Sequence, residues 1–358
     1  MNDRAWIATR KGLFELRLRD DAWQIERISF LGDPVSMVLP PQGQGFMLVA
    51  LNLGHFGVKV HASGDAGATW EEVATPAYPP QPDGAEGVPW KLVQIWSLAA
   101  GHGNTLWAGT LPGGLFRSND RARSWQLVEA LWMRPERAEW FGGGYDVPGI
   151  HSICPHPHRA GELLLGISCG GVWVTRDEGA TWQLQAQGMR ANFMPPERAD
   201  DQNVQDPHSI ARCAAQPDVL WCQHHNGIWR STDNAASWRQ IEGVPVSDFG
   251  FAVAVHPDAA GTAWFAPALA DERRVPRDGA LVVNRTRDGG ATFETLRSGL
   301  PQTDCYDLVY RHALAVAEDG RSLLMGSTTG GLWASADAGD HWRTVSLNLP
   351  PIHAVRFG

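Results

Sequence analysis

The sequence predicts an all-β fold, a seven-bladed β-propeller, and three observations support this prediction. An eight-residue pattern recurs six times, with 49 to 57 residues between successive copies of its aspartate. Each interval contains four short segments of strand character. The two ends of the chain also supply incomplete pieces of one further unit. A period near 50 residues with four strands per unit is typical of a propeller.

The eight-residue pattern reads Ser/Thr-x-Asp-x-x-x-Ser/Thr-Trp, as in Ser63 to Trp70, and its last two positions vary slightly in two copies. An aspartate can bond its own backbone, glycine accepts positive φ, and Ser or Thr bonds locally, so the pattern predicts a turn. We expect this turn to join the third and fourth strands of each blade. The aspartates of the six copies are Asp65, Asp120, Asp177, Asp233, Asp288 and Asp337.

The other elements follow the same order in every unit. A first strand is alternating or apolar, as in 251–255, and a second follows a short turn, as in 105–110. A third strand begins after a glycine and carries an aromatic residue, as in Gly171-Val-Trp173. A fourth strand, such as 182–185, follows the eight-residue turn.

The termini complete the prediction. Residues 5–10, 12–14 and 23–28 resemble a second, third and fourth strand with no first strand before them, whereas 353–357 is a strand without a unit. Pairing both ends in one blade gives seven blades and removes exposed sheet edges. We therefore expect residues 1–358 to form one propeller domain.

Composition narrows the function classes. The chain has 358 residues, a formal charge of −9, and five cysteines without a Cys-x-x-Cys pair. The negative charge argues against nucleic acid and anionic membranes as partners, and the cysteine pattern predicts reduced thiols. No segment is apolar enough for a membrane helix, and the start does not resemble a signal peptide. We expect a soluble, cytoplasmic protein.

The repeated pattern is that of the Asp box, or BNR repeat. With six copies between residues 63 and 342, the chain resembles the sialidase-like propellers, above all the stand-alone bacterial BNR proteins labelled glycosyl hydrolase or exo-sialidase-like. The resemblance implies a ligand site on the face opposite the boxes and a glycosyl hydrolase-like activity. It does not extend to the sialidase catalytic motif, because the chain lacks Arg-Ile-Pro and no glutamate lies near the late tyrosines Tyr306 and Tyr310. Such propellers also include assembly factors, so function must be argued from the site.

Histidines gather on the face expected to carry the ligand, which holds the blade-to-blade connections and the loops between second and third strands. They are His55, His151, His208, His224, His225, His312 and His353. Four of them, His151, His208, His312 and His353, lie near the entry to a first strand, and Gln94 has a similar place. Because His224 and His225 are adjacent in a strand, only one can face the axis.

The candidate catalytic residues are His151, His208, His312 and Asp248. Among the loop carboxylates, we expect Asp206, two residues before His208, and Asp248, just before Phe249, to point inward. Imidazole can act as an acid, a base or a metal ligand. His151, His208 and His225 are the metal candidates, since imidazoles from separate strands can bind Zn, Fe or Cu. A divalent metal is one option, and polar residues that only fill a channel mouth are the other.

The candidate ligand-binding residues are His55, Trp90, Gln94, Trp96, His225, Phe249 and Arg311. The Arg311 guanidinium matches a carboxylate or phosphate, although an ion pair with Asp307 is an equal alternative. Trp90 and Trp96, like Trp132 and Trp140, stand outside the repeated positions and can stack on a sugar or cover loop backbone. The longest connections on this face are 76–91, 131–150, 188–207 and 267–280.

Three functions stay open. The first is binding or hydrolysis of a small polar molecule, with a glycoside among the candidates, at the histidine-rich face. The second is a protein-interaction scaffold or assembly factor that uses the loops. The third is a metal-dependent lyase or hydrolase that uses the same histidines. The expected partner is a small molecule or a protein, not nucleic acid or a membrane.

Overall fold

The computed structural model describes residues 3–84 and 87–358. In this part of the chain the strands form seven four-stranded sheets, which are the blades of a seven-bladed β-propeller. The predicted fold class is therefore confirmed. The chain divides into two compact units, unit 1 (Met1–Val35 with His208–Gly358) and unit 2 (Ser36–Pro207). That the whole chain is one domain stays a prediction.

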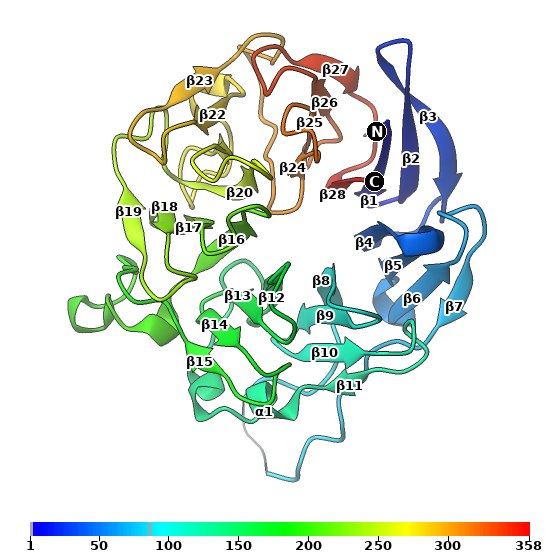
Figure 1. The fold of residues 1–358 in the computed structure, drawn as a ribbon, viewed down its shortest axis with the longest axis vertical. Coiled ribbons are helices and arrows are strands. Elements are labelled where there is room, and N and C mark those ends of the chain that lie inside the picture. The colour runs from blue at the N-terminus through cyan, green and yellow to red at the C-terminus, as the bar shows by residue number, and fades with distance from the viewer. Residues whose placement is uncertain (1–2, 85–86) are drawn as a thin grey trace. The chain divides into compact units, whose positions relative to one another are not determined.

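Unit 1 contains four blades, one of which joins the two termini. In that blade β28 lies beside β1, as the sequence predicts (Figure 1). The two strands pair antiparallel, with Trp6 opposite Arg356. The strands of unit 1, blade by blade, are β28 (Ile352–Phe357), β1 (Arg4–Thr9), β2 (Gly12–Arg19) and β3 (Ala22–Ser29); β16 (Pro207–Arg212), β17 (Leu220–His224), β18 (Gly227–Ser231) and β19 (Arg239–Ile241); β20 (Gly250–Val255), β21 (Ala263–Pro267), β22 (Val283–Thr286) and β23 (Glu294–Leu296); β24 (Leu314–Val316), β25 (Leu323–Gly326), β26 (Leu332–Ser335) and β27 (Arg343–Ser346).

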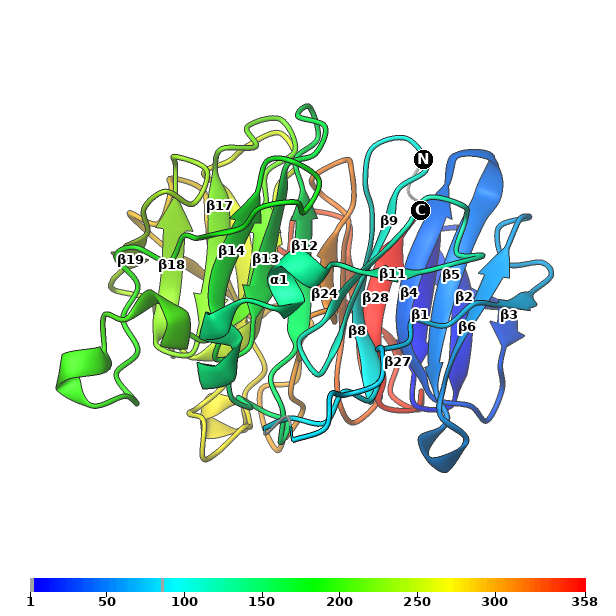
Figure 2. The same ribbon diagram turned by 90° about the horizontal axis from the view of Figure 1, so that it is seen from below.

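Unit 2 contains three blades, and β12, β13 and β14 of the last one lie side by side in Figure 2. Its strands are β4 (Val35–Gln42), β5 (Phe46–Asn52), β6 (Val58–Ser63) and β7 (Glu71–Val73); β8 (Gln94–Ala100), β9 (Leu106–Leu111), β10 (Leu115–Ser118) and β11 (Gln126–Leu127); β12 (Ile150–Pro155), β13 (Leu163–Ile167), β14 (Gly171–Thr175) and β15 (Gln183–Leu184).

Helices are short and lie in the connections. The one α-helix of the described chain is α1 (Glu129–Trp132), and the 3-10 turns are η1 (Gly43–Gly45), η2 (Gly54–Phe56), η3 (Pro135–Glu139), η4 (Pro196–Arg198), η5 (Gln202–Val204) and η6 (Arg277–Gly279). None of these described helices has the length and apolar character needed to cross a membrane.

The eight-residue pattern forms the turn that its chemistry predicts. Between β6 and β7, Asp65 accepts the Thr69 N–H at 2.8 Å and the Thr69 hydroxyl at 2.7 Å, while the Ser63 hydroxyl accepts the Gly67 N–H at 2.8 Å. The bonds from Thr69 and Ser63 lower the pKa of Asp65 to about 2. In the last copy the His341 ring replaces the hydroxyl, with Nδ1 2.8 Å from Asp337 Oδ2. Each copy is thus a self-bonded turn at the end of a third strand.

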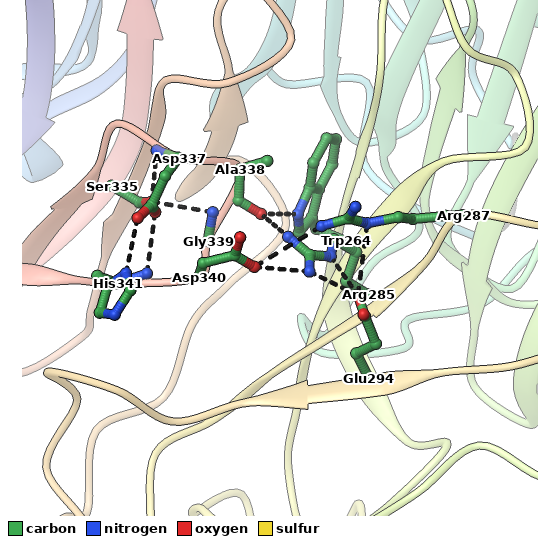
Figure 3. A network of polar contacts seen from close by, with 10 residues as sticks. All are labelled: Trp264, Arg285, Arg287, Glu294, Ser335, Asp337, Ala338, Gly339, Asp340 and His341. Carbon is green, nitrogen blue, oxygen red and sulfur yellow. Dashed lines mark hydrogen bonds and ion pairs between the residues drawn. The ribbon is translucent and has the colours of Figure 1, made fainter.

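A buried arginine ties one such turn to the preceding blade within unit 1 (Figure 3). Arg285 on β22 is 2% exposed, and it donates to the Ala338 carbonyl and to Asp340, both at 2.7 Å. The indole of Trp264 donates to the same carbonyl at 2.8 Å. Side chains of one blade therefore hold the β26–β27 turn of the next.

Candidate functional site

The polar residues expected at first-strand entries occupy that place. His151, His208 and His353 are the second residues of β12, β16 and β28, and Gln94 is the first residue of β8. His312 lies two residues before β24. Their roles in binding or catalysis stay predictions.

A local irregularity makes this entry position special. The register between first and second strands shifts around His151 in β12, Phe251 in β20 and Trp96 in β8. A β-bulge bends the strand and re-aims the side chain at the bulge. His151, Trp96 and Phe251 therefore share one structural position, which the sequence analysis recognised for the histidine alone.

In unit 2, this position gathers His151 and Trp96. His151 is fully buried, its Nδ1 lies 2.9 Å from the Ser152 hydroxyl, and its ring centroid lies 5.5 Å from that of Trp96. Trp96 also meets Tyr145 edge-on, at 5.1 Å. Gln94 accepts a hydrogen bond from Asn52 at 3.1 Å. His151 and Trp96 are therefore buried in unit 2, and Gln94 is half-buried.

The other unit 2 candidates lie on its loops. His55 is exposed on η2. Trp90 is half-buried and meets Trp132 edge-on at 5.3 Å, and the Arg137 guanidinium carbon lies 3.9 Å from the Trp132 ring centroid. Trp132 and Trp140 are 1% and 4% exposed, so these two rings serve to fill loop interiors.

Unit 1 holds the densest group of candidates, which we call the Phe251 cluster. Its members come from first-strand entries and from second-to-third-strand connections, so they lie at the ends of their blades opposite the eight-residue turns. They are His208, His225, Phe249, Phe251, Arg274, Tyr310 and Arg311.

Aromatic rings pack around Phe251. The His208 ring is stacked on Phe251, with centroids 4.5 Å apart and an angle of 14° between the planes. Phe249 and Tyr310 meet Phe251 edge-on at 5.4 and 5.0 Å. Phe251 is fully buried, so the cluster offers a rigid apolar base for charged groups.

Two guanidinium groups approach this same ring. The Cζ atoms of Arg311 and Arg274 lie 5.2 and 5.3 Å from the Phe251 centroid, and Arg311 is 7% exposed. Burial alone lowers the pKa of Arg274, but hydrogen bonds to Asp271 and Tyr310 outweigh it and raise the pKa above its ordinary value. Arg274 is not among the residues predicted from the sequence, although it lies in the long connection 267–280.

His224, the last residue of β17, and His225, which follows it, lie against different neighbours. His225 lies 5.4 Å from His208 between ring centroids. The His224 ring lies against Trp229, 6.0 Å between centroids, and its Nδ1 accepts the Asn226 N–H at 3.0 Å. His225 alone therefore belongs to the cluster.

Asp248 does not follow its prediction. It is exposed rather than turned inward. The Ser247 hydroxyl accepts the Phe249 N–H at 3.1 Å, and Gln223 donates to the Asp248 carbonyl at 2.8 Å. This local turn fixes the backbone so that Phe249, not Asp248, is buried.

The remaining unit 1 candidates differ in their partners: the His312 ring Nδ1 lies 3.4 Å from an Arg356 guanidinium nitrogen, whereas His353 contacts backbone. The carbonyl of His312 accepts from Arg356 at 3.0 Å, and the Nδ1 of His353 lies 2.9 Å from the Val35 carbonyl oxygen. Burial lowers the pKa of His353 and lowers that of Arg356 to about 10.

Asp307, the alternative partner of Arg311, accepts hydrogen bonds from the hydroxyls of Ser327 and Thr329 and from the Cys305 thiol.

Comparisons with known proteins identify the fold. No protein-family model matches the chain, and no curated protein matches it. The chain is similar to a GH74 xyloglucanase from Xanthomonas campestris (TM-score 0.65, 18% identity, 97% of this chain and 53% of that chain). It is also similar to an ancestral GH74 enzyme (0.61, 16%, 90% and 38%) and to YCF48 bound to D1 peptide (0.57, 14%, 94% and 90%).

These likenesses support a β-propeller that is shared by enzymes and by a peptide-bound protein. The chain spans 38% and 53% of the two GH74 enzymes. At identities of 14 to 18% the similarity shows the fold alone. The resemblance to sialidase-like BNR proteins stays a prediction, and the chain is a seven-bladed β-propeller.

Proposed function

We propose that the chain binds a small polar molecule with a carboxylate or phosphate group at the Phe251 cluster. The observation that carries this proposal is the approach of two guanidinium groups, Arg274 and Arg311, to one buried aromatic ring. Guanidinium groups stacked on rings are oriented for planar, bidentate recognition of anions.

The surroundings fit an anionic, sugar-like ligand. Asp271 holds Arg274 at 2.5 Å, which fixes the geometry of one cation. The Arg311 guanidinium is buried, with its Cζ 5.2 Å from the Phe251 ring centroid, which restricts the directions of its planar N–H donors. Phe249 and Tyr310 add flat apolar surface of the kind that packs on a sugar ring. A sugar acid or sugar phosphate combines both features.

The cluster supports binding better than glycoside hydrolysis. Hydrolysis of most glycosides uses two carboxyl groups that flank the scissile bond. Next to the cluster, Asp271 is bound to Arg274, and Asp248, which precedes Phe249 in the sequence, is exposed. Catalysis here would rest on His208 and His225 as acid and base. The catalytic assignment of His151, His312 and Asp248 also remains a proposal.

Calorimetry with matched ligands tests the proposal. Uronic acids and sugar phosphates should bind, and the corresponding neutral sugars should bind at least tenfold more weakly. Loss of a charge-assisted hydrogen bond is worth about 1.5–3 kcal/mol, so Arg311→Ala should weaken binding by roughly 10- to 150-fold.

Arg230→Lys is the matched control. Arg230 also lies over an aromatic ring in unit 1, 5.2 Å from the Trp221 centroid, but outside the Phe251 cluster. Its substitution should leave affinity unchanged. Equal affinity for acidic and neutral sugars, or equal effects of the two arginine substitutions, would refute the proposal.

A scaffold function is the second candidate, and a surface feature of unit 2 favours it. Phe141 and Phe193 are each 38% exposed, with ring centroids 6.3 Å apart, and Met133 is 65% exposed. These apolar side chains lie on the connections 131–150 and 188–207. Replacing Phe141 and Phe193 with Ser should remove a specific protein partner identified by crosslinking. The same change at Phe56, which is 77% exposed elsewhere in unit 2, should not; retention of the partner in the first variant would reject the scaffold surface.

A further inference from the structure

We propose that His208 and His225 bind a divalent transition-metal ion. One ring nitrogen of each lies within 4.8 Å of the other. Zinc–imidazole bonds are about 2.0–2.1 Å long, so two nitrogens on a tetrahedral ion are about 3.4 Å apart. The two nitrogens therefore need to approach each other by at most about 1.4 Å to bind one ion. His225 is half-buried on the β17–β18 turn and is the side chain placed to make that shift.

The bonding of His208 prepares it as a ligand. Its Nδ1 lies 2.6 Å from the Gly250 carbonyl oxygen, which can only accept, so Nδ1 carries the proton. Protonation at Nδ1 places the lone pair of the neutral ring on Nε2. Histidine ligands of metals commonly donate their second nitrogen to a backbone carbonyl in this way, which fixes the ring and strengthens the ligand.

The position of the His208 ring is fixed by packing as well. The ring is 1% exposed, stacked on Phe251 and edge-on to Phe249 at 5.6 Å. A ring held by these two contacts loses little freedom when it binds an ion. The adjacent His224 serves as an internal comparison, because its Nδ1 accepts a backbone N–H and its ring faces Trp229.

Two imidazole ligands favour certain metals and leave other coordination positions of the ion open. Imidazole suits Zn²⁺, Cu²⁺, Ni²⁺ and Co²⁺ rather than Mg²⁺ or Ca²⁺. Open coordination positions are the mark of metal sites that bind water or substrate. The positive charge of Arg274 near the ring is balanced by Asp271 at 2.5 Å. This metal site does not depend on the anionic ligand proposed above.

Metal titration of the chelator-stripped full-length chain tests the inference. The probes are Zn²⁺ alone in calorimetry and Cu²⁺ alone in electron paramagnetic resonance, with no sugar ligand present. We expect saturation at one ion per chain and nitrogen couplings from imidazole in the copper spectrum. His225→Ala should weaken binding by at least about tenfold, because even the loss of a residue that only supports a metal ligand costs roughly 10- to 100-fold.

The variant His208→Asn distinguishes a loss of metal binding from a loss of folding. The asparagine amide can replace Nδ1 as donor to Gly250 but offers nothing at the place of Nε2, so the chain should fold and lose metal binding. His158→Ala, an exposed histidine of unit 2, is the control and should bind as the unsubstituted chain does. Unchanged affinity in His225→Ala, or no saturation at one ion in the unsubstituted chain, would overturn the inference. Arg311→Ala should weaken sugar-acid binding only, so the two proposals can fail separately.

Discussion

Replacing Arg285 by Met should destabilise unit 1 far more than replacing Arg287 by Met. Both arginines approach the same carboxylates, Glu294 and Asp340, yet Arg285 is 2% exposed with bonds of 2.7 Å, whereas the Arg287 side chain is 55% exposed at 3.5 and 3.7 Å. Because both substitutions remove one positive charge, a difference between the two variants reports the burial and the bond geometry of Arg285.

The magnitude follows from what each substitution removes. The carboxylates beside Arg285 are about half exposed and can rehydrate, so each lost pair costs about 0.5 kcal/mol. The Ala338 carbonyl loses one of its two donors, at about 1 kcal/mol, while the indole of Trp264 remains. The sum for Arg285→Met is about 2 kcal/mol, against at most about 0.5 kcal/mol for Arg287→Met.

Urea unfolding followed by tryptophan fluorescence measures this difference. With a slope of about 3 kcal/mol per molar urea, Arg285→Met should lower the midpoint by about 0.7 M. A drop of the same size in Arg287→Met, or no drop in Arg285→Met, would show that the buried arginine does not hold the β26–β27 turn.

Three further outcomes follow from the structure. The pKa of about 2 at Asp65, Asp120 and Asp288 lies below the ordinary value near 4. The stability that these turns contribute is therefore full above pH 4 and is lost as the pH falls toward 2. A melting temperature that stays constant between pH 4 and pH 2 would contradict this prediction. The variant Gly330→Ala should unfold at a lower urea concentration than Gly32→Ala. Both glycines have positive φ, but only at Gly330 would the added Cβ lie 1.7 Å from a backbone oxygen, that of Leu349. Equal urea midpoints for the two variants would exclude this clash. His208→Ala should lower the free energy of unfolding by about 1–3 kcal/mol, because the Gly250 carbonyl loses its donor, whereas His208→Asn should lower it less. A lower melting temperature for His208→Asn than for His208→Ala would count against the hydrogen bond to Gly250.

The sequence predicted the fold well because the fold is repeated. Each copy of the eight-residue pattern marks the same turn, and six copies fix the order of the strands between them. The closing blade also followed, since β1 to β3 lacked a first strand and β28 lacked a blade. A turn or strand pattern that is weak evidence in one copy becomes strong evidence when it recurs at a regular interval.

The candidate site was harder to predict because it depends on the direction of individual side chains. Phe251 occupies an entry position of the kind that holds His151, yet this equivalence arises from a bulge, which strand alternation does not reveal. Arg274 was hidden in a long connection whose length could be read from the sequence but whose path could not. Asp248 was expected to point inward, but the turn at Ser247 buries Phe249 and leaves Asp248 exposed.

The two interpretations of the entry histidines, structural filling and ligand binding, are compatible because an imidazole has two nitrogens. His208 and His353 both use Nδ1 on a backbone carbonyl, of Gly250 and Val35 respectively. That bond alone explains why a histidine at a first-strand entry stabilises the blade. What distinguishes His208 is its neighbours, since His225 and the ring of Phe251 lie beside it. The function of a repeated position in this propeller therefore has to be sought where the neighbours differ between blades, and in unit 1 that place is the Phe251 cluster.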